Sequence, residues 1–386
     1  MPLIPYLPSL FKIDFLPPFY FTYWIIAIAV IAIFHEFAHG IFAKRYGIKI
    51  KTTGFGFLGP FLAAFVEPDE KQMQQKSKFQ QITVLSAGTF TNLVLALLFF
   101  LLLSGFFALT YAPAGAMFNT YVTGAVGVNT ISMIGGMPVD TPTNQGVIDL
   151  INKNNITNDL VLGSNGNSLN FTKITANNKT YFMAIDILKQ QLEKGEDNVF
   201  LYLDFPAINS GLRGVIIEID GKEVKTHEGL SLILDNYSPG DEINIKTKED
   251  GEILDYKFNL GENPIKIGKP MIGIGYATSQ RGGFMGRIAD FFNFFKKPAT
   301  YYEPIFNAEL IIFIYNLIWW LALINFSVAL INMWPVAIFD GGRMFMLTVW
   351  AITGSEKFAK TAFKIMTYLI LGALLALMFG WFTAIF

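Results

Sequence analysis

Three ionisable residues lie close together in an otherwise apolar segment of the chain. They are His35, Glu36 and His39, in the pattern His-Glu-x-x-His. On a helix, residues four apart lie on one face, so both imidazoles can bind one Zn²⁺ while Glu36 stands beside the water that the metal activates. Ionisable side chains are costly inside a bilayer, so three of them within five residues need a shared purpose. The pattern predicts a zinc site rather than three polar side chains satisfied by helix packing.

The third metal ligand is expected to be a carboxylate. The sequence has no cysteine, and its remaining histidine, His227, lies in the polar middle of the chain. The strongest carboxylate is Asp340, which follows a helix-breaking proline and precedes two glycines that permit a turn. A catalytic zinc has three protein ligands and one open position. We therefore expect His35, His39 and Asp340 to bind Zn²⁺.

The composition predicts a membrane protein. Hydrophobic residues make up 52% of the chain and charged residues only 15%, whereas about a quarter of the residues in a soluble domain are charged. The formal net charge of −1 offers no basic excess for a phosphate backbone, so no nucleic-acid partner is expected. Without cysteine, a disulfide framework, a thiolate metal site and a thiol nucleophile are excluded.

Several apolar segments are long enough to cross a bilayer, which takes about 20 helical residues. The first is not expected to be a cleaved signal peptide, because it lacks a basic flank and exceeds the usual apolar length. A further apolar stretch, residues 344–352, is too short to span. We predict a polytopic α-helical membrane protein with four spans, over residues 20–43, 82–109, 310–334 and 362–385.

The positive charges predict the orientation of these spans, because Lys and Arg gather in short cytoplasmic loops. Both short loops are basic, whereas the N-terminal flank offers only Lys12. We therefore expect the metal site near the cytoplasmic face, and the long polar insert and both termini outside. The basic residues of the two loops are Lys44, Arg45, Lys49, Lys51, Lys71, Lys76 and Lys78, then Arg343, Lys357, Lys360 and Lys364.

The long insert separates two parts of the membrane core, residues 1–110 and 309–386. Within the insert, residues 201–278 resemble a PDZ domain. The resemblance rests on a loop region ending at Gly214, followed by a strand that begins at Val215, where relatives usually have Asp, and ends in an Asp-Gly turn. A helix near residues 227–236 and strands over 242–259 would complete the domain. PDZ domains bind peptides or C-termini along an exposed sheet edge.

The flanks of that domain are less distinctive. Residues 111–200 repeat part of the theme in Ile131-Ser-Met-Ile-Gly-Gly-Met-Pro-Val, which fits a diverged second PDZ-like unit or an irregular Asn-rich cap. Residues 279–308 are aromatic and basic, and we expect an amphipathic helix over 281–302 that lies in the outer membrane interface.

A β-hairpin is expected between the first two spans. Residues 48–66 alternate in polarity and turn at Gly59-Pro60. A plain surface hairpin would explain this pattern. A hairpin associated with the membrane could instead hold an unwound substrate along its free edge as an added strand.

Taken together, the chain resembles the site-2 protease family of intramembrane zinc metalloproteases, in particular its PDZ-containing branch. The resemblance rests on the His35 motif, the Asn332-x-x-Pro335-x-x-x-x-Asp340-Gly motif, a Gly-x-x-x-Asn element from Gly88 to Asn92, and the order of the spans. Thr89 and Ala337 stand where relatives often have proline.

The resemblance implies hydrolysis of peptide bonds in transmembrane segments of other proteins. It implies Glu36 as general base, and Asn332 and Asn92 as substrate-binding residues. Helix packing is the alternative for Asn332 and the better explanation for Asn92. A membrane receptor or scaffold with a structural zinc and a peptide-binding PDZ region is the main alternative, although a structural zinc would need a fourth protein ligand. A zinc transporter would need metal-binding residues on several spans.

Overall fold

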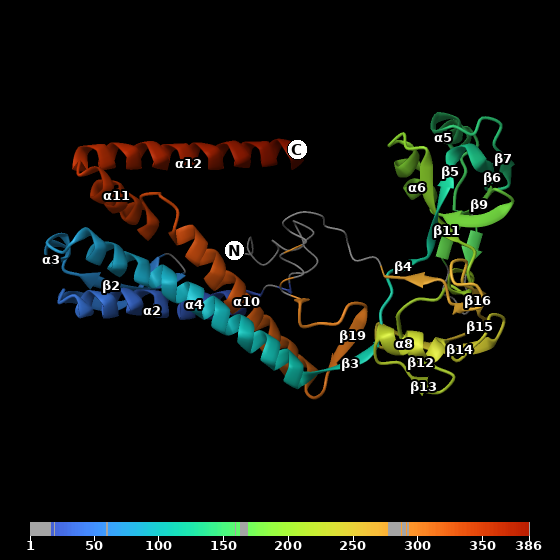
Figure 1. Cartoon of the computed structure of the whole chain (residues 1–386), viewed down its shortest axis with the longest axis horizontal. Coiled ribbons are helices and arrows are strands. Elements are labelled where there is room, and N and C mark those ends of the chain that lie inside the picture. Colours follow the sequence, from blue (N-terminus) through green and yellow to red (C-terminus); the bar gives the residue numbers. More distant parts are fainter. Residues whose placement is uncertain are drawn as a thin grey trace. The chain divides into compact units, whose positions relative to one another are not determined.

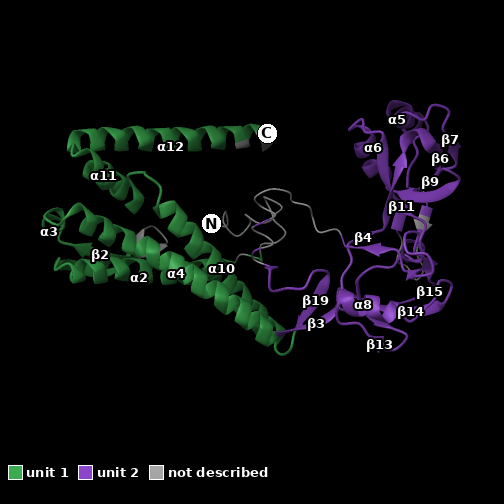
Figure 2. Ribbon diagram, viewed as in Figure 1, with its two compact units in different colours: residues 1–110, 304–386 green, residues 111–303 purple. Residues whose placement is uncertain are grey.

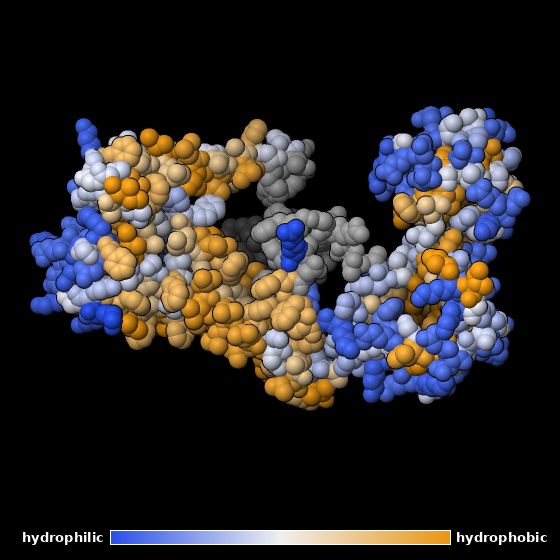
Figure 3. All heavy atoms as spheres, viewed as in Figure 1, coloured by the Kyte–Doolittle hydropathy of each residue, from blue (hydrophilic) through white to orange (hydrophobic). Residues whose placement is uncertain are grey.

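The chain divides into two compact units, shown in Figure 2. The computed structural model describes residues 17–18, 20–58, 61–158, 160–162, 169–276, 287, 291 and 293–385. Unit 1 joins Met1–Thr110 to Pro304–Phe386, and unit 2 is the insert Tyr111–Glu303. Apolar residues dominate the visible surface of the unit 1 helices, and polar residues that of unit 2 (Figure 3).

Four helices of unit 1 are long and apolar enough to cross a membrane, as predicted. Two of them begin before the predicted apolar runs because capped, charged turns precede those runs: Ser77 Oγ accepts a hydrogen bond from the Gln80 N–H, and Ser355 Oγ accepts one from the Phe358 N–H. The four helices are α2 (Phe21–Arg45), α4 (Lys78–Thr110), α10 (Ala308–Asn332) and α12 (Glu356–Ile385).

Helix α4 packs against both α2 and α10. Its other side carries exposed large apolar residues, among them Phe90, Leu97 and Leu101, as expected where lipid replaces water as the solvent. Between α2 and α10, the rings of Tyr23 and Phe313 lie 5.2 Å apart.

The predicted hairpin is present between α2 and α4. Strands β1 (Ile50–Leu58) and β2 (Phe61–Pro68) pair antiparallel, with Gly54 opposite Phe65. The predicted turn at residues 59–60 lies outside the described residues. A short helix follows, α3 (Glu70–Gln74), whose N-terminus is capped by the Asp69 carboxylate.

A break separates α10 from α11 (Asp340–Thr353). Helix α10 ends before Pro335, whose ring cannot continue a helix. The two glycines after Asp340 allow α11 to begin close to this break. A Cβ on Gly341 would overlap the backbone of Met333, and one on Gly342 would overlap the Val336 carbonyl.

The first half of unit 2 is a sheet with two helices around one apolar core. The sheet order is β5-β11-β10-β9-β6-β7, with β8 paired to β9. Its elements are β5 (Thr123–Gly127), the 3-10 turn η1 (Val128–Thr130), β6 (Ile131–Ile134), β7 (Met137–Pro138), α5 (Asn144–Lys153), β8 (Leu160–Leu162), β9 (Leu169–Ala176), β10 (Lys179–Met183), α6 (Ile185–Leu192) and β11 (Asn198–Leu203).

The second half of unit 2 has its own core and a sheet in the order β15-β14-β12-β3-β19, with β13 paired to β12. The helix and strands expected over 227–236 and 242–259 are present here as α8, β14 and β15. The elements are β3 (Tyr111–Ala116), α7 (Pro206–Asn209), β12 (Val215–Ile219), β13 (Lys222–Glu223), α8 (His227–Leu234), β14 (Glu242–Glu249), β15 (Glu252–Asn259) and β19 (Thr300–Pro304). Two small ladders pair β4 (Thr120–Tyr121) with β18 (Ile274–Gly275), and β16 (Gly261–Glu262) with β17 (Pro270–Met271).

The sheet corrects one prediction. The end of the amphipathic helix predicted over 281–302 is wrong, because Thr300–Pro304 is strand β19. Its Thr-Tyr-Tyr run favours a strand, and pairing with β3 provides the partner. Much of the rest of that predicted helix, residues 281–286, 288–290 and 292, lies outside the described residues.

Candidate metal centre

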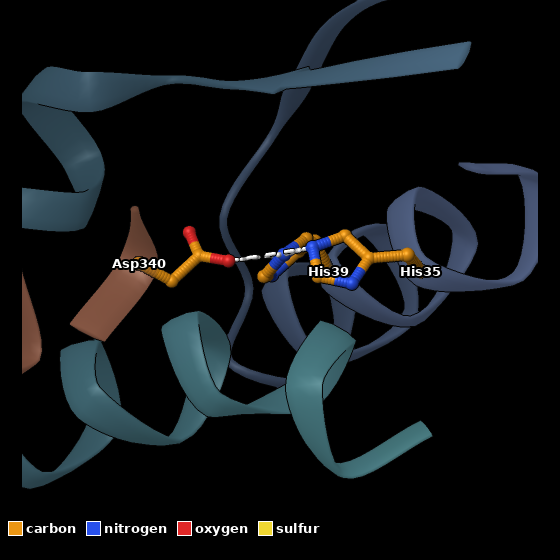
Figure 4. Close-up of side chains that lie close together, drawn as sticks. All are labelled: His35, His39 and Asp340. Atoms are coloured by element: carbon orange, nitrogen blue, oxygen red, sulfur yellow. Dashed lines mark hydrogen bonds and ion pairs between the residues drawn. The ribbon is translucent and has the colours of Figure 1, made fainter. Parts of the chain in front are cut away.

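Helices α2 and α11 bring the three predicted ligands together (Figure 4). Asp340 Oδ2 lies 3.3 Å from His35 Nε2 and 3.4 Å from His39 Nε2. The two Nε2 atoms are 3.1 Å apart. One donor atom from each residue lies within 4.8 Å of the others, a spacing that can hold one metal ion. Both histidines expose only 11% of their side chains, so the cluster is largely removed from water.

Helix α4 orients both imidazoles from behind. His39 Nδ1 lies 2.8 Å from the Val84 carbonyl oxygen, and His35 Nδ1 lies 3.0 Å from Nδ2 of the fully buried Asn92. Val84, Gly88 and Asn92 are spaced four residues apart and therefore share one face of α4. This face holds the rings and directs both Nε2 atoms toward Asp340.

The hydrogen-bond partners of the rings fit metal binding. The Val84 carbonyl can only accept, so His39 Nδ1 carries the proton and its Nε2 keeps a lone pair. Asn92 Oδ1 is buried and, among the described residues, has no hydrogen-bond partner. Turning this amide over lets Oδ1 accept from His35 Nδ1–H and also frees His35 Nε2 to bind a metal. Two imidazoles and a carboxylate are a suitable donor set for Zn²⁺.

The carboxylate of Asp340 is suited to its place in the cluster. Burial acts to raise the pKa of this group, but when both imidazoles are protonated, their hydrogen bonds and charges outweigh burial and hold the pKa well below its usual range. A bound metal ion would take the place of the protons on the two Nε2 atoms. Asp340 is therefore ionised at neutral pH. Its side chain remains 24% exposed, so the cluster is not sealed on this side.

Glu36 projects toward the hairpin. Its Oε2 atom accepts a hydrogen bond of 3.0 Å from the main-chain N–H of Val66 in β2. One helical turn further on, Gly40 leaves room for the Val66 side chain, since a Cβ there would lie 3.3 Å from Val66 Cγ1. This contact was not predictable from the sequence, because a main-chain donor has no residue signature; the single glycine of α2, Gly40, is the sequence feature that accompanies it.

The remaining candidate residues occupy different settings. The side chain of Asn92 contacts His35, which is a candidate metal ligand, and so lies behind the cluster. Asn332 ends α10 and is half-buried, and its side-chain amide forms no hydrogen bond with the described residues. His227 begins α8 in unit 2 and is not part of the cluster.

Gly88 gives a direct test of this packing. A Cβ at Gly88 would lie 2.5 Å from His35 Cε1 and from His39 Nε2. We expect Gly88→Ala to weaken zinc binding about tenfold or more, as changes around metal ligands do, although alanine is the better helix former. The measurement is the zinc Kd of the purified protein by chelator competition.

Gly105→Ala is the matched control on the same helix, because nothing lies within 4 Å of a Cβ there. Equal zinc affinity in the two variants would show that Gly88 is not required for the ligand geometry.

Comparisons with known proteins identify the family. A family model described as peptidase family M50 matches residues 23–377, nearly the whole chain. A protein of Methanocaldococcus jannaschii named only as an uncharacterized protein is 42% identical over 74 residues, covering 19% of this chain and 20% of the relative. The chain thus matches about a fifth of the length of that relative.

Proposed function

Since the chain belongs to peptidase family M50, the site-2 protease family, we propose that it is an intramembrane zinc endopeptidase that cuts transmembrane segments of other proteins. The observation that carries this proposal is the convergence of His35, His39 and Asp340, with α4 directing both imidazoles. These three residues would hold the ion. Bound Zn²⁺ supplies a Lewis acid that polarises the scissile carbonyl and lowers the pKa of water.

Glu36 is proposed to move the proton. Its Oε2 atom is held by the Val66 N–H, which leaves Oε1 to take a proton from the attacking water. The same oxygen then returns the proton to the amine nitrogen of the departing peptide. The Val66 contact fixes the carboxylate and so restricts the direction in which Oε1 can act.

The substrate must be unwound, because a helix hides its peptide bonds. In β2, the Val66 N–H points away from β1 toward Glu36, so Ala64, two residues away, also points its N–H outward. This outer edge can pair with an extended substrate and lead it to the cluster. Asn332, whose amide has no partner among the described residues, is proposed to bind the substrate backbone.

Proline substitutions separate these two uses of the β2 edge. Val66→Pro removes an outward-pointing N–H and no donor to β1, so we expect kcat to fall by about tenfold or more as Glu36 loses its anchor, with little change in KM and zinc content. Ala64→Pro removes an N–H of the same edge that Glu36 does not use, and should mainly raise KM. Steady-state cleavage of a labelled transmembrane peptide measures both. An unchanged kcat in Val66→Pro would mean that Glu36 needs no main-chain anchor.

Orientation follows from charge and is part of the proposal. Helix α2 carries Lys44 and Arg45 in its last turn, one turn beyond His39. This basic end is proposed to face the cytoplasm, with unit 2 on the opposite side of the membrane. The cluster then lies near the cytoplasmic face.

Removing the metal tests the function itself. We expect the protein, reconstituted in lipid vesicles, to cut a transmembrane peptide, to lose this activity in a zinc chelator and to regain it with added Zn²⁺. Mass spectrometry should place the cut within the apolar segment. Cleavage that persists after zinc has been removed to below the protein concentration would contradict the proposal.

A further inference from the structure

Strand β19 covers the outer edge of β3 in the second sheet of unit 2, where β3 also contacts α8 (Figure 1). Without β19, β3 would be the last strand on this side. Edge strands present unpaired N–H and C=O groups, and peptide-binding domains use such edges for strand addition. Here a segment of the same chain already occupies the edge.

The start of this segment is packed into the fold. The main-chain N–H of Met117, just after β3, donates to the Ala299 carbonyl at 2.8 Å. Ala299 and Thr300 are buried, with 5% and 8% of their surfaces exposed. The segment is therefore bound as a ligand strand would be, through its backbone and small buried side chains.

Opposite charges mark the two ends of the segment. Before the strand, Lys297 Nζ lies 3.1 Å from Glu228 Oε2 of α8. At its end, Glu303 lies 2.6 Å from Lys248 Nζ of β14. Both pairs are partly or largely exposed, so each contributes little stability. These ion pairs therefore set the register of β19 against β3 and favour a particular sequence, but they do not hold β19 tightly. Another strand can displace it.

We propose that the β3 edge beside α8 is a peptide-binding site that β19 fills in the resting chain. Its external ligand is an extended segment with a basic residue before, and an acidic residue after, a short β-branched and aromatic run. Glu228 and Lys248 select those two charges. The edge of β3 beside α8 is therefore occupied by a segment of the same chain, and this proposal is independent of the zinc chemistry.

A peptide copied from the chain is the probe. A fluorescent peptide with the sequence of residues 297–304 should bind the full-length wild-type protein weakly. In Tyr301→Pro/Tyr302→Pro, it should bind about tenfold more tightly or better, the equivalent of one or two hydrogen bonds. Neighbouring N–H groups of a strand point in opposite directions, so one of the two prolines removes a donor to β3. Equal affinity for both proteins would overturn the proposal.

Variants of the Glu303–Lys248 ion pair test the same site if the proline variant does not fold. Glu303→Lys should loosen β19 and raise peptide affinity about threefold, the scale of one exposed ion pair. Adding Lys248→Glu should restore the blocked state. Lys246→Glu is the control on the same strand, because Lys246 pairs with Glu218 of β12 instead. Peptide binding that responds equally to Lys246→Glu and to the Lys248 and Glu303 changes would overturn the assigned site.

Discussion

Replacing Glu36 by glutamine is expected to abolish cleavage while zinc remains bound. Glutamine keeps the shape of the side chain and its oxygen can still accept the Val66 N–H, but it cannot take a proton from water. General acid–base groups contribute about 10²- to 10⁴-fold to rate, so kcat should fall by at least 100-fold. The measurements are cleavage of a transmembrane peptide and the metal content of the same preparation.

Glu67→Gln is the matched control, one residue beyond Val66 in β2. The Glu67 carboxylate accepts a hydrogen bond from Thr52 Oγ1 across the hairpin, so its charge is not assigned to the reaction. We expect near-normal turnover in this variant. A zinc-loaded Glu36→Gln protein that cleaved at the wild-type rate would contradict the role assigned to Glu36.

Replacing Asp340 is expected to lower zinc binding and activity together. Without this carboxylate, two imidazoles remain, too few to hold a catalytic zinc well. The loss in zinc affinity for Asp340→Ala should exceed the roughly 10- to 100-fold typical of changes to residues behind the ligands. Chelator competition measures the Kd, and cleavage assays on the same sample measure activity.

Asp69→Asn provides the control, because the Asp69 carboxylate caps α3 through the Gln72 N–H. Asparagine caps a helix about as well as aspartate, so this variant should keep both its stability and its zinc affinity. Tight, stoichiometric zinc binding by Asp340→Ala would mean that another residue completes the ligand set.

The membrane helices and the family were predictable because their signals are local. Apolar runs located α2, α4, α10 and α12 to within a few residues of most ends. The spacing of His35 and His39 on one helix face, and the proline and glycines around Asp340, pointed to the cluster that the structure brings together.

The groups that orient the cluster were not predictable. The Val84 carbonyl and the Val66 N–H are main-chain atoms, and nothing in the residue type marks them. Strand β19 was also misassigned, because its state depends on pairing with β3, almost two hundred residues earlier in the chain. Whether such a segment forms a strand or a helix depends on contacts with distant segments, and these contacts cannot be read from a single sequence.

The break between α10 and α11 bears on how the protein is made. His35 and His39 are synthesised early, in α2. Asp340 is synthesised only after the whole of unit 2 and α10. A nascent or truncated chain that ends before this break carries an incomplete ligand set. The three candidate metal ligands come together only when both halves of unit 1 have been made. Under the proposed function, a half-built molecule is therefore expected to have no metal centre and no protease activity.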